Sequence, residues 1–305
     1  MTPTLVGAPA KVNLTLRVGP RRPDGYHQLA TVFMAVGLAD QVTCTPLDDG
    51  RIVVDISGEG AALLPRDGTD LTGRAAALLR ARYGHPGLGV HLQVDKAIPV
   101  AAGMAGGSAD AAAALRGCND AWDLGVDDDG LDALAAELGA DVPFALMGGV
   151  AYGLGRGDKL VPLPCTGQYH WVLALAHEGL STARVFAAHD ALVAAVEATG
   201  DTPHSGLAAT GNLVVALGIG DAARLGAQLA NDLTDAAISL RPELGDTLRA
   251  GAAMPGVLGA VLSGSGPTCA FLCDPDAAED VAARLPALPQ VAGTRLVVGP
   301  VGGAG

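Results

Sequence analysis

The amino-acid sequence predicts an α+β protein built from two domains. The chain has 305 residues, about twice the length of a common single domain. Strand-like patterns dominate the first hundred residues, whereas strands and helices are mixed through the remainder. Half of the residues are hydrophobic, which favours a packed core over disorder.

The first domain is expected over residues 1–157. Apolar and polar side chains alternate over residues 12–18, so one strand turns its apolar side chains to the core and places Lys11 and Asn13 together on its non-core face. Further strands are predicted at 29–36, 41–46, 51–56 and 90–94, and helices at 71–83, 109–122 and 130–138. A turn at 153–157 between two strand-like runs marks the domain boundary.

The second domain is expected over residues 158–305. Its predicted strands cover 171–176, 257–262, 268–273 and 294–298, with a helix between the last two. Its other predicted helices cover 182–196, 207–217, 222–240 and 242–252. Residues 251–273 carry no charge, but Pro255 and several glycines divide them into two short apolar runs, which predict strand, loop and strand, not a membrane span.

Charge and cysteine content exclude several classes of protein. The formal net charge is −13 and no basic stripe is visible, so no nucleic-acid partner is expected. Five cysteines without a C-x-x-C pair fit neither a disulfide framework nor a zinc ribbon, and together with the absence of a signal-peptide pattern they favour the cytoplasm. Only three lysines occur, so a lysine inside a motif carries unusual weight.

The strongest local signal is a glycine-rich segment between a predicted strand and an alanine-rich predicted helix, here called the phosphate loop (residues 99–109). Its glycines allow backbone N–H groups to approach an anion, and the following helix adds its free N–H groups and positive dipole end. The alternative is a tight strand-to-helix turn with Ser108 as N-cap. The segment reads Pro99, Val100, Ala101, Ala102, Gly103, Met104, Ala105, Gly106, Gly107, Ser108 and Ala109.

Three weaker signals accompany this loop. A second glycine-rich segment, the glycine loop (residues 263–267), contains Gly264, Ser265 and Gly266 between two predicted strands and could reach the same anion or be a plain hairpin. Asp141 stands at a predicted helix start, where N-capping is the simple explanation. The turn after the Lys11 strand presents Tyr26 and His27, and a surface turn would explain it equally.

Taken together and in this order, these segments resemble the GHMP kinase superfamily, which includes galactose, homoserine, mevalonate and phosphomevalonate kinases. Its phosphate-loop pattern P-x-x-x-G-L-G-S-S-S-A corresponds to residues 99–109, with Met104 for leucine and two glycines for the first two serines. The resemblance runs from Pro9 to beyond Thr268 and implies a two-domain GHMP kinase fold. It implies an N-terminal mixed β/α domain and a C-terminal α/β sandwich domain with an antiparallel sheet.

The resemblance further implies an ATP-dependent small-molecule kinase. The glycine pair in the loop and the Asp24-Gly25-Tyr26-His27 turn resemble the branch that phosphorylates the 2-hydroxyl of a cytidine diphosphate conjugate of methylerythritol, in non-mevalonate isoprenoid synthesis. Asp141 matches the catalytic aspartate and Lys11 the lysine beside it. Mg²⁺ is expected with ATP, yet the sequence shows no dedicated carboxylate cage, and Asp110 near the loop is a weak candidate ligand.

The same resemblance assigns substrate contacts. Tyr26, His27 and Phe186 match residues that hold the cytosine, Asn13 would reach the substrate, and Gly264, Ser265 and Gly266 would complete its pocket. Helix-core packing is an equal explanation for Phe186, and a solvated strand position is the alternative for Asn13. Another GHMP kinase of the homoserine or mevalonate type, or a non-catalytic ligand sensor, remains an alternative. The oligomeric state is open, with a homodimer as one option.

Overall fold

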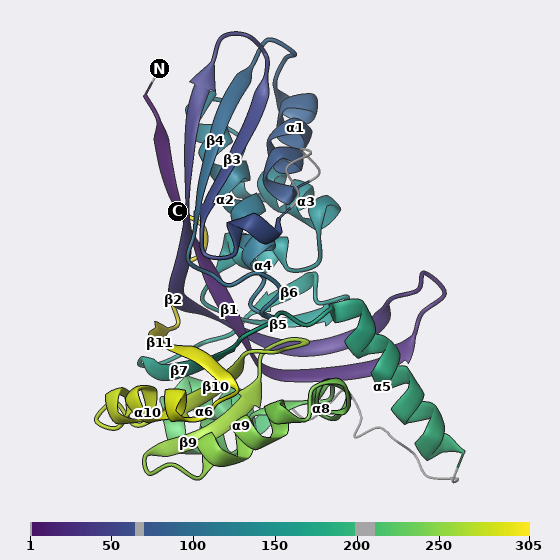
Figure 1. Ribbon diagram of the computed structural model, residues 1–305. Coiled ribbons are helices and arrows are strands. Elements are labelled where there is room, and N and C mark those ends of the chain that lie inside the picture. Colours follow the sequence, from purple (N-terminus) through teal and green to yellow (C-terminus); the bar gives the residue numbers. More distant parts are fainter. Residues whose placement is uncertain (1, 65–69, 199–210) are drawn as a thin grey trace.

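Two β-sheets form the framework of the computed structural model, which describes residues 2–64, 70–198 and 211–305 (Figure 1). The first sheet has seven strands in the order β3-β4-β2-β1-β8, with β5 paired to β2 and β6 to β5. Its strands are β1 (Thr4–Arg21), β2 (His27–Leu47), β3 (Ile52–Gly58), β4 (Gly89–Lys96), β5 (Val150–Gly155), β6 (Lys159–Pro162) and β8 (Ala230–Asn231).

The long strands β1 and β2 run through most of the molecule (Figure 1). The sequence predicts two separate strands at 29–36 and 41–46, and this is wrong, since β2 is continuous from His27 to Leu47. Pairing with β1 continues across the expected gap because an irregularity between Pro9 and Ala10 absorbs the change of register. One half of β2 therefore pairs with β4 and the other half with β5.

Both faces of β1 are buried at the centre of the molecule. The apolar side chains of residues 12–18 enter the core as predicted. Lys11, Asn13 and Thr15, expected on a non-core face, are 6%, 2% and 1% exposed. Lys11 and Asn13 have hydrogen-bond partners inside the protein, and the burial of Asn13 excludes a solvated strand position for it.

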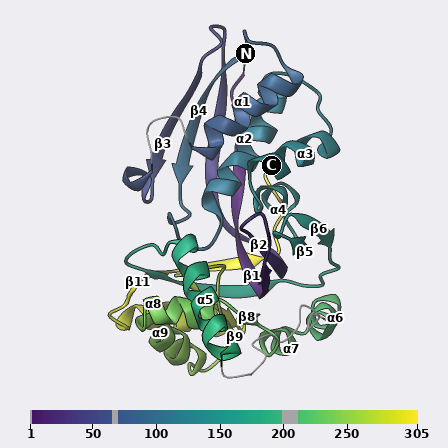
Figure 2. The same ribbon diagram turned by 90° about the vertical axis from the view of Figure 1, so that its right-hand side faces the viewer.

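Four helices cover one face of the first sheet (Figures 1 and 2). They are α1 (Leu71–Tyr83), α2 (Gly106–Ala121), α3 (Asp128–Leu138) and α4 (Val142–Met147). The side chains of residues 111–114, all alanine, are fully buried in α2, which lets this helix lie close to β1 and β2. The bounds predicted for α1 are confirmed, and its N-cap Asp70 accepts a hydrogen bond from the Gly73 backbone N–H at 2.9 Å.

The second sheet is antiparallel throughout, in the order β11-β7-β10-β9. Its strands are β7 (Tyr169–Ala176), β9 (Val257–Leu262), β10 (Cys269–Cys273) and β11 (Val291–Gly299). The neighbouring helices are α5 (Thr182–Glu197), α6 (Gly211–Ile219), α7 (Ala222–Gly226), α8 (Thr234–Leu240), α9 (Glu243–Ala252) and α10 (Ala278–Arg284). The predicted α+β class with a C-terminal antiparallel sheet is confirmed.

Two predicted helices of this half differ from the structure. The single helix expected at 222–240 is wrong: it is divided into α7 and α8 by the short strand β8, because Ala230 and Asn231 pair with Thr15 and Leu16 of β1. This long-range pairing overrides the local helical pattern. The helix expected at 207–217 falls partly outside the described residues, and α6 accounts for the part within them.

The two sheets share one hydrophobic core. Val12 and Leu14 of β1 belong to the same buried cluster as Tyr169, Trp171 and Leu173 of β7. The hairpin β5-β6 belongs to the first sheet, and Gly305 at the chain end exchanges backbone hydrogen bonds with Gly7. The boundary at 157/158 therefore cuts a paired hairpin and stays a prediction. Among the described helices, none combines the length and apolar character needed to cross a membrane.

Candidate active site

The cleft of interest has a volume of about 350 Å³ and lies where the ends of several elements meet. Its walls come from β1, β2, the phosphate loop, the glycine loop and the start of α5. Of the predicted site residues, the cleft is lined by Lys11, Asn13, Pro99, Val100, Ala101, Ala102, Gly103, Ala105, Gly106, Gly107, Ser108, Asp141, Phe186, Gly264 and Ser265. Most of the residues proposed from the sequence thus meet in one place.

The phosphate loop ends in the first turn of α2. This helix begins at Gly106, three residues before the predicted start, with Ala105 as its N-cap in the left-handed conformation (φ 61°). Ser108 therefore lies within the first turn and is not the N-cap. The backbone N–H groups of Gly106, Gly107 and Ser108 have no partner within the helix, so together with the helix dipole they form a ready site for an anion.

Two glycines allow the phosphate loop and the glycine loop to touch. A Cβ atom on Gly103 (φ 76°) would lie 2.2 Å from the Ser263 carbonyl oxygen, and one on Gly264 would lie 2.8 Å from the Gly103 carbonyl oxygen. Neither position can carry a larger residue without moving backbone. Gly264 and Ser265 line the cleft as a result, whereas Gly266 packs against Leu262 behind it.

Lys11 sits at the centre of a buried polar network. Its Nζ atom donates to Asn13 Oδ1 at 2.5 Å and to the Gly103 carbonyl oxygen at 3.0 Å. Asn13 Nδ2 in turn donates to Thr31 Oγ1 at 2.8 Å, and Thr31 Oγ1 donates to the Thr15 carbonyl oxygen at 2.7 Å. The network holds the ammonium at the base of the cleft with its direction defined.

Asp141 occupies the N-cap position of α4, but its carboxylate does not cap the helix. Among the described residues, no hydrogen bond or ion pair engages this half-buried carboxylate. Lys11 and Asp141 line the same cleft without forming an ion pair. Burial lowers the pKa of Lys11, and the negative charge of Asp141 acts in the opposite direction. Asp141 is thus a carboxylate free to accept a proton from a bound hydroxyl.

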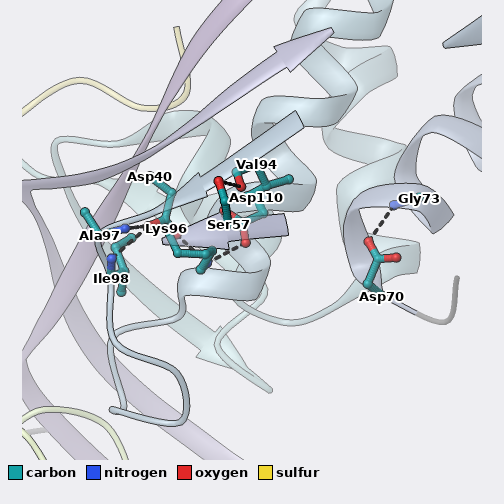
Figure 3. A network of polar contacts seen from close by, with 9 residues as sticks. All are labelled: Asp40, Ser57, Asp70, Gly73, Val94, Lys96, Ala97, Ile98 and Asp110. Atoms are coloured by element: carbon teal, nitrogen blue, oxygen red, sulfur yellow. Dashed lines mark hydrogen bonds and ion pairs between the residues drawn. The ribbon is translucent and has the colours of Figure 1, made fainter. Parts of the chain in front are cut away.

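A second buried lysine, Lys96, is the last residue of β4 and precedes the phosphate loop closely in the chain (Figure 3). Lys96 Nζ contacts carboxylate oxygens of both Asp40 and Asp110, the latter at 2.5 Å. Asp40 also accepts hydrogen bonds from the backbone N–H groups of Ala97 and Ile98. We call Asp40, Lys96 and Asp110 the ion cluster; it joins β2, the end of β4 and α2 at the floor of the cleft.

Only one of the three residues expected to hold a base lines the cleft. Phe186 lines it, and the His27 ring stacks on Phe186 with centroids 5.0 Å apart. His27 Nε2 lies 2.6 Å from Asp190 Oδ1. Tyr26 is 56% exposed outside the cleft, with the Arg156 guanidinium 5.2 Å from its ring centre. The structure therefore joins His27 to Phe186 but leaves Tyr26 apart from both.

Sequence reasoning did not single out several residues of the site. Lys96 had a usable signal, being one of three lysines and lying directly before the phosphate loop. Arg156 lines the cleft from the turn assigned only to the domain boundary, and Asp158 holds its guanidinium at 2.9 and 3.1 Å. Thr31 gave no signal, because a threonine in a strand is ordinary.

Comparison with known proteins gives consistent matches. The descriptions "GHMP kinases N terminal domain" and "GHMP kinases C terminal" match residues 70–149 and 213–289. The chain is 52% identical over 304 residues to the 4-diphosphocytidyl-2-C-methyl-D-erythritol kinase of Nocardia farcinica, covering 99% of this chain and 96% of that one. It is 53% identical over 310 residues to the protein of the same name from Thermobifida fusca, covering 99% and 98%.

A solved structure agrees with these matches. The crystal structure of a 4-(cytidine 5'-diphospho)-2C-methyl-D-erythritol kinase superposes with a TM-score of 0.76 at 32% identity, covering 99% of this chain and 100% of that one. The similarity therefore extends over both sheets and over the cleft between the two glycine-containing loops.

The first turn of α2 provides a test of anion binding. A Cβ atom on Gly107 would meet no protein atom within 4 Å, so Gly107→Val should fold normally yet place a side chain at the free N–H groups. We expect ATP affinity to fall roughly tenfold or more. Such a decrease corresponds to about 1.5 kcal/mol of binding free energy, which is the contribution of one charge-assisted hydrogen bond. Calorimetric titration measures it.

The matched control is Gly218→Val in α6, where a Cβ atom also meets nothing within 4 Å and which does not line the cleft. Its ATP affinity should equal that of the wild type. Unchanged affinity in a folded Gly107→Val protein would show that the phosphates bind elsewhere.

Proposed function

The chain belongs to the 4-diphosphocytidyl-2-C-methyl-D-erythritol kinase family of GHMP kinases, and on this premise we propose the reaction that its cleft carries out. The γ-phosphoryl group of ATP is transferred to the 2-hydroxyl of 4-diphosphocytidyl-2-C-methyl-D-erythritol, in non-mevalonate isoprenoid precursor synthesis. The observation that carries this proposal is the meeting of Lys11, Asp141 and the free N–H groups of α2 in one cleft. A homoserine or mevalonate type enzyme is less consistent with the relatives at 52% and 53% identity.

ATP would bind with its phosphates at the start of α2. The N–H groups of Gly106, Gly107 and Ser108 hold phosphate oxygens, and Ser108 adds a hydroxyl donor. Leu64, Leu71 and Ile98 line the same cleft beyond the loop and offer an apolar surface for the nucleotide base.

The chemical step needs a base and a defined approach. Asp141 accepts the proton of the substrate's 2-hydroxyl as that oxygen bonds to the γ-phosphorus, and the bond from the γ-phosphorus to the ADP oxygen breaks. Lys11 is held by Asn13 and Gly103, so its ammonium faces the reacting oxygens from a fixed place and favours their negative charge. Because burial lowers its pKa, Lys11 loses this charge at a lower pH than an exposed lysine does.

Mg²⁺ would enter with ATP, held by phosphate oxygens and water. Among the described residues, no three His, Cys, Asp or Glu side chains gather into a metal site. Asp110, the nearest carboxylate to the loop, has one oxygen on Lys96 already. We therefore assign no residue to the metal, and the ion's contribution is to offset negative charge on the phosphates.

The cytidine end of the substrate would lie at Phe186 and Arg156, which both line the cleft. One face of Phe186 is covered by His27, so the base would stack on the other face. Tyr26 lies against the guanidinium of Arg156, which itself lines the cleft, and the contact of the Tyr26 ring with the base stays a prediction. His27, held by Asp190 on the covered face of Phe186, would support that ring from behind, and its contact with a polar edge of the cytosine stays a prediction.

We also propose a cytoplasmic location, since all five cysteines are free and four of them are buried. The partner is a small molecule, and the net charge of −13 gives no support to nucleic-acid binding. The homodimer stays a prediction, which a measurement of the oligomeric state in solution would test.

The proposed reaction is tested by ADP release with a panel of sugar alcohols and their cytidine diphosphate conjugates. We expect turnover with the cytidine-linked methylerythritol and little with the others, including homoserine and mevalonate as further acceptors. Equal or faster turnover with homoserine or mevalonate would overturn the substrate assignment.

Asp141→Asn tests the base. We expect turnover to fall by roughly 100-fold or more, because the amide cannot accept the proton, while ATP affinity stays close to that of the wild type. Single-turnover rates measure the chemical step, and calorimetric ATP titration measures the ATP affinity. Asp129→Asn, an exposed residue of α3, is the control and should be unchanged in both. Wild-type turnover by Asp141→Asn would exclude this residue as the base.

The aromatic residues are tested by the double variant Tyr26→Ala, Phe186→Ala. Each stack on a base contributes about 1 to 3 kcal/mol, so kcat/KM for the cytidine conjugate should fall by roughly 10² to 10⁴ with ATP affinity retained. Tyr83→Ala, on an exposed ring at the end of α1, is the control. If the double variant prefers the cytidine conjugate by the wild-type margin, specificity lies elsewhere in the cleft.

A further inference from the structure

The ion cluster lies next to the anion-binding turn of α2, and Figure 3 shows its three side chains pointing toward one another. Asp40, Lys96 and Asp110 are 0%, 6% and 3% exposed, so all three groups are withdrawn from water. Lys96 and Asp110 nevertheless line the cleft. A Cβ atom on Gly106, the first residue of α2, would lie 3.2 Å from Lys96 Nζ. The ammonium of Lys96 is therefore within contact range of the backbone that would hold the phosphates, and the two carboxylates lie directly behind it.

The two carboxylates of the cluster are not equivalent. Both oxygens of Asp40 are engaged, one by Lys96 and the other by the N–H groups of Ala97 and Ile98 at 2.6 and 2.7 Å. Asp110 meets Lys96 with Oδ2, whereas its Oδ1 is buried and has no hydrogen-bond partner among the described residues. Asp40 thus has three donors on its two oxygens, whereas Asp110 has only the ammonium that it shares with Asp40.

The charge of the cluster depends on the protonation of Asp110. With both carboxylates ionised, two negative charges face the one positive charge of Lys96, and an excess negative charge lies under the anion site. With Asp110 protonated the cluster is neutral. A polyphosphate bound above it is repelled by the first form and not by the second, and the repulsion is strong because the cluster is buried.

The surroundings favour the neutral acid. Burial raises the pKa of Asp110 to about 7, the Lys96 charge opposes this rise, and the Asp40 charge adds to it. From the other elements around this end of the cleft, Lys11 of β1 bonds to Asn13 and Gly103, and Asp141 faces the cleft from the start of α4. The described charged side chains of α1 and α3 are not among the groups that act on Asp110.

We propose that Asp110 is the neutral acid when polyphosphate is bound, so that the ion cluster takes up a proton as the nucleotide binds. The proposal deepens the proposed function and depends on it only in taking the bound anion to be the phosphates of ATP. Asp110 acts here as a positioning residue: its proton removes a repulsive charge and keeps Lys96 beneath the first turn of α2.

The direction of the pH effect follows from linkage. Below about pH 7 the free protein already carries the proton, so ATP binds at full strength. As the pH rises through about 7, Asp110 of the free protein loses its proton. ATP binding then requires Asp110 to take up a proton from solution, so the affinity for ATP falls. By reciprocity, bound polyphosphate raises the pKa of Asp110 further.

The experiment measures ATP affinity by calorimetry from about pH 6 to about pH 8.5 for the wild type and for Asp110→Asn. The amide has the same shape, can still accept from Lys96 and carries no titrating proton. We expect wild-type affinity to fall roughly 5- to 10-fold more than that of the variant over this range. Protonation of the ATP phosphates also changes over this pH range, but it affects both proteins equally and therefore cancels when the two are compared.

An infrared measurement on the wild type keeps the proposal testable if the variant does not fold. With ¹³C-labelled aspartate, adding ATP at about pH 8 should produce a protonated-carboxyl band that carries the isotope shift, which ATP cannot give. A labelled band supports the proposal, and its absence overturns it. In a folded variant the band should disappear.

The outcomes separate this inference from the function it rests on. Identical pH profiles for the wild type and Asp110→Asn would overturn the inference and leave the kinase assignment intact. Failure of the wild type to bind ATP at any pH would overturn the proposed function and this inference with it.

Discussion

Direct backbone contact between the phosphate loop and the glycine loop is the constraint on which the site depends. It is possible only because Gly103 and Gly264 have no side chains. The Gly103 carbonyl oxygen accepts hydrogen bonds from both Lys11 Nζ and Ser263 Oγ. Lys11 belongs to β1 of the first sheet and Ser263 directly follows β9 of the second, so this one oxygen links the two sheets. Thr182 at the start of α5 joins the same assembly through its hydroxyl contact with Ser265 at 2.9 Å. The cleft is therefore built across the two halves of the chain, not within either of them.

Buried cations organise the space around this contact. Lys11 on one side and Lys96 on the other are each 6% exposed, and each has oxygen partners that compensate for the loss of water. The two are held differently: Lys11 contacts neutral oxygens and faces the free carboxylate of Asp141, whereas Lys96 lies between two carboxylates. One lysine is consequently suited to the reacting oxygens and the other to setting the charge beneath the bound phosphates.

Several parts of the fold and of the site could be predicted from local sequence. The bounds of α1, the hairpin of β5 and β6, and the antiparallel strands β9 and β10 follow from periodicity and turn residues. The phosphate loop and the glycine loop were identified because glycine patterns between regular elements reflect a local backbone requirement. Where prediction was wrong, at β2 and at the 222–240 segment, pairing with the distant strand β1 decided the outcome.

The sequence by itself determined the family and hence the kind of chemistry, because the lysine strand, the aspartate at a helix start and the two glycine-rich loops occur together and in a fixed order, although each alone has a simpler explanation. Only the tertiary structure decided which side chains become partners around the cleft. Lys96 meets Asp40, which is 56 positions away in the chain, and His27 meets Asp190, which is 163 positions away. The physical reason is that a side chain's charge state and direction depend on what surrounds it in space, and strand pairing brings those surroundings from parts of the chain that no local pattern connects.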